Sequence, residues 1–305
     1  MVKFILKRIG TMIIAMFMII LITFTLMHSI PGGPFTNTKG VPEEVTQAME
    51  AKYGLDQPLW KQYIIYLGNF LRGDFGVSYT KAGLTVNKVI ADGFPFSLTI
   101  GIYASLVVVF AGILFGSVCA LRQNKLIDRF FMVLSTLGST IPSFVLATGF
   151  LFLFSKTLGL VPAFGVDEVA GYIGPVLVIG AFPLSFITRL TRTSLVEEQQ
   201  QDYIRTARSK GISEFKVIYK HALRNALLPV VTYIGPMVAS IVTGSFVIET
   251  VFGIPGVGQL FTDSIVNRDY PLIMGITVFF AVLLVLAVLI VDLVYVLIDP
   301  RIKLD

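Results

Sequence analysis

The chain has 305 residues, of which 55% are hydrophobic and only 14% are charged. Roughly 25% charged residues is usual in soluble domains, so this chain has too little polar surface to cover itself in water, and a soluble domain is excluded. The net charge of +5 does not indicate nucleic-acid binding, because Lys and Arg gather between apolar stretches, where they set membrane orientation.

Six apolar stretches predict membrane-spanning helices. A bilayer core about 30 Å thick requires roughly 20 apolar residues in a helix. The first stretch is too long for a signal-peptide core and precedes no small-x-small cleavage site, so we expect it to be retained. The predicted spans are 9–30, 96–121, 130–154, 172–187, 227–251 and 272–298.

The distribution of basic residues predicts that both termini are cytoplasmic. With six spans, segments 1–8, 122–129, 188–226 and 299–305 share one side, and they hold two-thirds of the 24 Lys and Arg residues. Most of the others lie in the long segment 31–95, where charge has little influence on orientation. The fold class is therefore an all-α integral membrane protein of about six transmembrane helices, with an external domain after the first.

Two helices are predicted within that external segment, at 43–53 and 59–71. An amphipathic helix over 59–71 would lie on the membrane surface or cover a pore mouth, and a small local core for the segment is an equal alternative. The apolar residues that recur at helical spacing are Trp60, Tyr63, Ile64, Leu67 and Leu71.

The segment 189–228 predicts two short amphipathic helices that a partner protein could grip. Acids open its first half at Glu197, Glu198 and Asp202, and bases followed by Gly211 close it, as at a helix end capped by a left-handed glycine. A second helix is expected from Ser213, the N-cap. A hairpin lying on anionic lipid is the alternative. The stripe expected on this second helix is Phe215, Ile218, Tyr219, Ala222 and Ala226.

The sequence contains no motif for catalysis, nucleotide binding or metal binding. Cys119 is the only cysteine and is expected to be a buried core residue. His28 is expected to be structural, and Asp292, near the cytoplasmic edge of the last span, to be solvated or paired. With no chain of buried carboxylates, a carrier driven by protons or sodium is disfavoured. We therefore expect a transport subunit rather than an enzyme, with no metal site and no cofactor on this chain.

Several motifs resemble one family of membrane proteins. DYIRTARSKG at 202–211 with KHALRNALLP at 220–229 resembles the EAA loop of ABC importer permeases, in the form found in the peptide and nickel branch. There the first triplet departs from Glu-Ala-Ala, as RTA does here. YGLDQPL at 53–59, GDFGVS at 73–78, FGIPGVG at 252–258, NRDYP at 267–271 and DPR at 299–301 agree with that branch. The short N-terminus and PGGPF at 31–35 resemble the first permease subunit of an oligopeptide importer.

The resemblance implies three regions: the N-terminus and first helix (1–30), the external domain (31–95), and a five-helix permease core (96–305) with the coupling loop at about 198–229. The chain would pair with a second permease subunit in a bacterial inner or plasma membrane, and two ATPase subunits would hold ATP and magnesium. An extracytoplasmic binding protein would deliver oligopeptide. Dipeptide or nickel is the alternative substrate, and an ATP-independent carrier the alternative mechanism.

The implied site residues form two groups. In the coupling loop they are Tyr203, Arg205, Thr206, Ala207, Lys210, Gly211, Lys220, His221, Arg224, Asn225 and Pro229. In the external loop before the last span they are Pro255, Gly256, Gly258, Arg268 and Asp269.

Overall fold

The structure, a computed structural model, describes residues 2–30, 33–35, 43–81 and 83–298, with the side chains of 8–30, 33–35, 47–81 and 83–290. In this part of the chain all regular structure is helical, apart from one isolated bridge between Val77 and Thr85. Four helices are long and apolar enough to cross a membrane, and two bent helix pairs raise the number of spans to as many as six. The prediction of an all-α membrane protein is confirmed, and Asp292 lies outside the described side chains.

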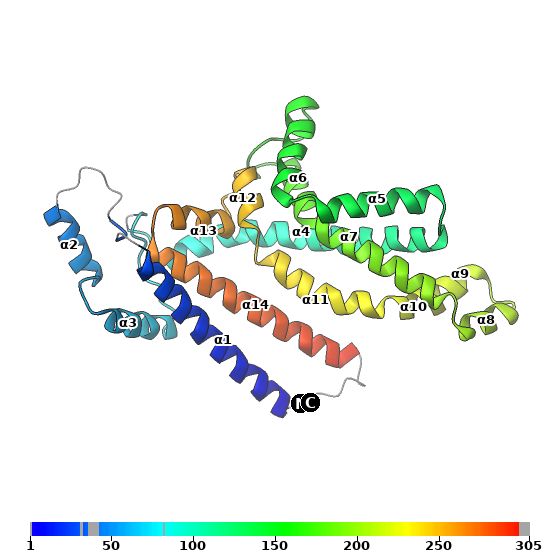
Figure 1. Cartoon of the computed structure of the whole chain (residues 1–305), viewed down its shortest axis with the longest axis horizontal. Helices are drawn as coiled ribbons and strands as arrows, with labels where there is room; N and C mark the ends of the chain where they lie inside the picture. Colours follow the sequence, from blue (N-terminus) through cyan, green and yellow to red (C-terminus); the bar gives the residue numbers. More distant parts are fainter. Residues whose placement is uncertain (1, 31–32, 36–42, 82, 299–305) are drawn as a thin grey trace.

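Figure 1 shows an elongated bundle with α2 and α3 at one end and α8, α9 and α10 at the other. We call these the α3 side and the α8 side. The helices are α1 (Val2–Ser29), α2 (Glu43–Tyr53), α3 (Leu59–Leu71), α4 (Val86–Leu121), α5 (Leu126–Thr140), α6 (Ser143–Phe150), α7 (Ile173–Glu198), α8 (Asp202–Ser209), α9 (Glu214–Lys216), α10 (Leu223–Ala226), α11 (Leu228–Val242), α12 (Phe246–Phe252), α13 (Val257–Val266) and α14 (Tyr270–Ile298). Short π-helical stretches, Leu151–Thr157 and Val217–Ala222, follow α6 and α9, and a 3-10 turn, Val169–Tyr172, precedes α7.

The centre of the bundle is the close pairing of α4 with α7. Two glycines one turn apart on α4 allow it: a Cβ at Gly112 would lie 2.6 Å from Ile187 Cγ2, and one at Gly116 would lie 2.6 Å from the Thr188 carbonyl oxygen. Small residues at this spacing let two membrane helices approach closely. The main core joins α4, α6, α7, α11 and α12, with Ile100, Ala104, Val108, Ile187, Met237, Ile248 and Phe252 among its buried residues.

A second core joins α1, α3 and the first half of α14. Ile20, Phe24 and Met27 of α1 are buried against Tyr270, Met274 and other residues of α14, and aromatic residues of α3 close the cluster. His28 contacts the Phe24 carbonyl oxygen through Nδ1 and the Gln62 side chain through Nε2. These contacts agree with the structural role expected for His28, and the expected burial of Cys119 is confirmed. The predicted helices at 43–53 and 59–71 are also confirmed.

The predicted span 130–154 is not one continuous helix, because the helix breaks within it. α5 begins earlier, at Leu126, and α6 turns away from it with a bend of 111°. Ile141, at the break, has an extended backbone (φ −77°, ψ 126°), which is the conformation that a following proline, here Pro142, imposes on the residue before it.

The predicted span 227–251 is wrong at its end. α11 stops at Val242, and a turn over 243–245, with Gly244 at φ +86°, sends the chain into α12. A positive φ is incompatible with continuing the helix, so the apolar residues after Gly244 form a separate short helix instead of the last turns of a span.

Two other spans were predicted too short. α4 begins at Val86 rather than residue 96, because Val86, Val89 and Ile90 are buried against α13 and α14 and Pro95 is accommodated inside the helix. α7 continues to Glu198, because Thr191 and Leu195 extend its buried stripe. Glu197 and Glu198 therefore end α7 instead of opening the next helix.

Candidate functional site

The predicted coupling loop forms a compact unit on the α8 side, which we call the α8–α10 unit (199–227). α8 ends at Ser209, and Gly211 has φ +71°, so the left-handed glycine predicted at this helix end is confirmed. No atom lies within 4 Å of a Cβ placed on Gly211, so only the backbone conformation requires glycine there. Ser213 takes the N-cap position of α9, although its side chain makes no capping hydrogen bond.

A small hydrophobic core holds this unit together and joins it to the spans. Ile204 and Ala207 of α8 are buried against Val217, Ala222 and Ala226. Leu195 of α7 and Ala120 of α4 belong to the same cluster. α8 therefore packs as one cluster with two of the central helices, α4 and α7.

Polar contacts close the unit on its surface. The Tyr203 hydroxyl donates to Glu198 and accepts a hydrogen bond from Asn225 Nδ2 at 2.9 Å, which links α7, α8 and α10. Burial, and the Glu198 carboxylate, raise the pKa of Tyr203, so the phenol remains protonated. Across the turn at Gly211, Arg208 donates two hydrogen bonds to Glu214, at 2.6 and 3.1 Å.

A buried ion pair fixes the end of α7 next to this unit. Arg192 donates to both carboxylate oxygens of Asp128 at the start of α5, at 2.6 and 2.7 Å, and the Asn124 amide donates to the same carboxylate. The Asp128 side chain is only 3% exposed. A two-point Arg–carboxylate contact fixes orientation as well as distance, so α5 and α7 are held in one geometry.

The predicted coupling residues fall into two groups in the structure: some hold the α8–α10 unit together, and others are exposed on its surface. Ala207 is buried, Tyr203 and Asn225 tie helices to one another, and Pro229 lies in the first turn of α11, where the chain bends by 51°. His221 is half-buried. The other predicted coupling residues are all exposed: Arg205, Thr206, Lys210, Gly211, Lys220 and Arg224.

The stripe predicted on the second helix of the loop is only partly correct. Ile218, Ala222 and Ala226 are buried, but Phe215 and Tyr219 are exposed, with their rings 4.4 Å apart. The π-helical stretch Val217–Ala222 contains more residues per turn than an α-helix, which rotates Phe215 and Tyr219 away from the buried face.

Gly256 and Gly258 of the second predicted group lie against a buried carboxylate. Glu249, which is 1% exposed, accepts hydrogen bonds from the amides of Gly258 and Gln259 at 2.8 and 3.2 Å, and so caps α13. Gly258 has no room for a side chain, since a Cβ would lie 2.8 Å from the Phe246 backbone nitrogen. The Val257 amide donates to Ser97 Oγ at 2.9 Å, which fixes this segment to α4. Gly256 is the N-cap residue of α13, and the exposed Pro255 precedes it.

Asp269 joins the start of α14 to the segment after α3. Its carboxylate accepts from Ser78 Oγ at 2.5 Å, Thr80 Oγ1 at 2.7 Å and the amides of Tyr79 and Thr80 at 3.1 and 3.2 Å. It also accepts from the Leu272 amide at 3.3 Å. Arg268, next to it, has φ +54° and ends α13. One fully buried side chain thus holds together two segments 190 residues apart.

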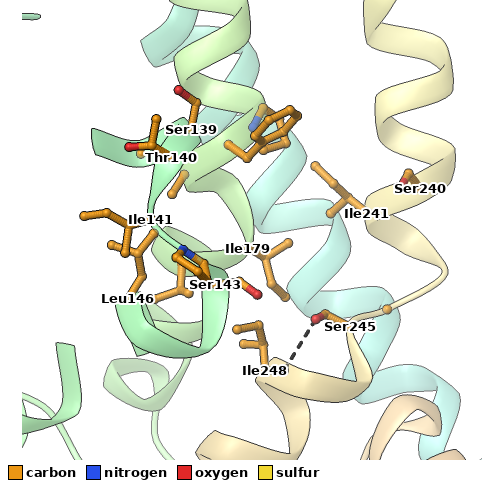
Figure 2. A pocket seen from close by; sticks show the side chains of 17 residues that line it. Ser139, Thr140, Ile141, Ser143, Leu146, Ile179, Ser240, Ile241, Ser245 and Ile248 are labelled. Atoms are coloured by element: carbon orange, nitrogen blue, oxygen red, sulfur yellow. Dashed lines mark hydrogen bonds between the residues drawn. The ribbon is translucent and has the colours of Figure 1, made fainter. Parts of the chain in front are cut away.

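A cavity of about 470 Å³ lies where the break between α5 and α6 meets the break between α11 and α12. Its wall includes the turn between α5 and α6, the stretch of α7 around Pro183, and the turn between α11 and α12 (Figure 2). Irregular backbone at membrane depth is tolerated where it lines a polar cavity or is buried in protein. None of its lining residues is charged, and its hydroxyl groups come from Ser139, Thr140, Ser143, Ser240 and Ser245.

Two important residues, Asp128 and Glu249, were missed in the sequence. Glu249 is the one acid in the stretch 227–251, and an acid within an apolar stretch is itself a signal of function. Asp128 is the one acid among the bases of 122–129. Its partner lies 64 residues away, however, so no local pattern predicts the pair.

These features define a class of protein: a multi-span membrane subunit with a rigid loop on one side and a broken-helix cavity in its interior. The family model "binding-protein-dependent transport system inner membrane component" matches residues 112–304, and the N-terminal model of the same family matches residues 1–101. The chain belongs to this family, and it is a multi-pass inner-membrane protein and a transport component.

Relatives that match along the full length are named either dipeptide or oligopeptide permeases. The dipeptide transport system permease protein DppB of Bacillus subtilis is 47% identical over 100% of this chain and 99% of its own. The oligopeptide transport system permease protein OppB of Haemophilus influenzae is 43% identical over 99% and 100%, respectively. A solved structure of the inward-facing MetNI methionine ABC transporter matches with a TM-score of 0.51 at 16% identity, over 68% of this chain and 96% of its own. That likeness supports the fold.

Proposed function

We propose that the chain is one of two permease subunits of an ATP-driven peptide importer, coupled to its ATPase subunits through the α8–α10 unit. The observation that carries this proposal is the core that the unit shares with α7 and α4. The Arg192–Asp128 pair in turn holds α7 to α5. A docking element transmits force only if it moves together with the helices it is meant to open and close. ATP and magnesium belong on the partner chains; among the described residues no cluster of His, Cys, Asp and Glu could hold a metal ion.

The proposed orientation places the α8 side in the cytoplasm. Exposed bases on the α8–α10 unit, together with the excess of Lys and Arg in the segments predicted on that side, support it. Segment 31–95 then lies outside, where it receives an extracytoplasmic peptide-binding protein. The second permease subunit completes the pathway along the open side of the cavity.

The proposed substrate class is peptides, and oligopeptides are the first to test. Both dipeptide and oligopeptide permeases are relatives of similar identity, and the motif at 31–35 favours the oligopeptide branch. Competition for uptake of a labelled oligopeptide by unlabelled oligopeptide, dipeptide or nickel ion ranks the three substrates. A dipeptide that competes better than any longer peptide assigns the dipeptide alternative.

We place the peptide's passage at the cavity between the α5–α6 and α11–α12 breaks. Peptides share a backbone that donates and accepts hydrogen bonds, while their side chains vary in charge. Hydroxyl groups from Thr140, Ser143 and Ser240 serve that backbone in both roles, and a wall without charges does not select for or against charged side chains. These three residues are exposed in the isolated chain.

Ser240→Phe should block this passage. The added ring occupies the cavity without replacing a buried contact, so we expect peptide uptake to fall by at least about tenfold while the ATPase subunits remain bound, because a pore conducts only what its narrowest part admits. Uptake and ATPase pull-down, each normalised to permease in the membrane, measure this.

Val133→Phe is the matched control. Val133 is 60% exposed on α5, outside the cavity lining, so the same ring there should leave uptake near the parental value. If Ser240→Phe transports like Val133→Phe, the peptide passes elsewhere.

A further inference from the structure

Helix α3 has two apolar faces, and only one of them is covered within the chain. Tyr63, Tyr66, Leu67 and Phe70 pack into the core formed with α1 and α14. Trp60, Ile64 and Leu71 lie along another stripe of the same helix and are 65%, 59% and 77% exposed. Lys61 is the one charged residue within the helix, and Gln62 and Asn69 lie near it on the remaining side.

The contacts of α3 place it beside the membrane-spanning part of α1. The Tyr63 ring lies 5.3 Å from that of Phe24 and 6.2 Å from that of Phe17. Phe17 precedes Ser29, the end of the span, by twelve residues, which is about 18 Å along a helix. Half of a bilayer core is about 15 Å thick. Figure 1 likewise shows α3 alongside α1 rather than beyond its end.

The exposed stripe of α3 is continuous with the exposed wall of α1. Phe17, whose ring contacts that of Tyr63, is itself 44% exposed. Large apolar residues around it on α1, such as Ile13, Ile14 and Met18, are exposed as well. An exposed apolar wall on a membrane-spanning helix is suited to contact with lipid acyl chains.

We propose that α3 is embedded in the bilayer leaflet on the α3 side, with Trp60, Ile64 and Leu71 in contact with lipid acyl chains. The exposed Lys61 then faces the headgroups and water, Gln62 keeps its contact with His28, and the tryptophan occupies the interfacial region that this residue favours. The segment after the first span is thereby anchored in lipid rather than lying on the bundle as a purely aqueous domain. This inference depends on neither the ATPase subunits nor the substrate.

The chain offers a direct probe, since Trp60 is its only tryptophan. The full chain is purified and reconstituted in lipid nanodiscs in which part of the phosphatidylcholine carries bromine on its acyl chains. We expect brominated lipid to reduce Trp60 emission at least about twofold, because an interfacial tryptophan lies within contact distance of the acyl chains. Aqueous iodide should quench it weakly.

Two relocated tryptophans calibrate the measurement in a Trp60→Phe background. Ile14→Trp reports a lipid-facing position on α1, and Phe215→Trp reports an exposed position on α9. Emission from Trp60 should follow the Ile14→Trp protein. Quenching by iodide to the extent seen for Phe215→Trp means that the stripe is in water, and quenching by neither agent means that protein covers it. Either result overturns the proposal.

Discussion

Gly211→Val should uncouple the transporter, with peptide uptake falling by more than tenfold while the chain remains abundant in the membrane. A β-branched side chain in the left-handed region costs roughly 2 kcal/mol, and about 1.4 kcal/mol is already tenfold in an equilibrium. The turn relaxes to another conformation, so α9 moves relative to α8 and the Arg208–Glu214 contact is lost. No buried contact within the spans changes. Uptake and ATPase pull-down are measured together.

Two controls separate this effect from general damage. Gly211→Asn should behave nearly like the parent, because asparagine tolerates the left-handed conformation. Gly180→Val places a side chain inside the bundle, where even a Cβ would lie 2.9 Å from Val108 Cγ2, so it should lower expression. If Gly211→Val retains its ATPases and transports normally, the α8–α10 unit is not the coupling element.

Asp269→Ala should release the segment after α3 from the bundle. The change leaves the Ser78 and Thr80 hydroxyls and three backbone amides without their acceptor. Each buried group left without a partner costs about 1–3 kcal/mol, so we expect rapid proteolysis within 72–85 and loss of most uptake. Limited proteolysis in nanodiscs, followed by mass spectrometry, detects the opened segment.

Asp263→Ala removes an exposed acid from neighbouring α13 and should leave the digestion pattern unchanged. Asp269→Asn keeps one acceptor oxygen, but its NH₂ group faces hydroxyls and amides that are themselves donors. Its rate of proteolysis should therefore lie between those of the parent and Asp269→Ala. A digestion pattern for Asp269→Ala that matches the parent's would mean that this carboxylate does not hold the segment.

Local patterns were sufficient for elements whose cause lies within a few residues. The end of α8 at Gly211, the helices α2 and α3, and the apolar spans follow from charge order, periodicity and length. Asp269 was selected by resemblance, but four of its five hydrogen bonds reach residues about 190 positions away and could not be derived from the sequence.

The breaks within two predicted spans show a different limit of prediction from the sequence. Two spans were predicted from hydropathy alone, so they ran through Pro142 and Gly244, although both residues favour a break in a helix. Two alternatives left open for 59–71, a local core and a membrane surface, refer to two faces of one helix. The structure packs one face of α3 on a core shared with α1 and α14 rather than on a core local to the segment, and lipid contact by the exposed face stays a proposal.

The most direct measurement of coupling is peptide accumulation by the complete transporter in proteoliposomes. ATP and magnesium are trapped in the lumen, and binding protein with labelled peptide is added outside, so that complexes with the α8 side inward are active. We predict accumulation against a gradient that requires luminal ATP and is lost with Gly211→Val. Accumulation by this chain without ATPase subunits, driven by an ion gradient alone, would contradict an ATP-driven permease and assign a secondary carrier.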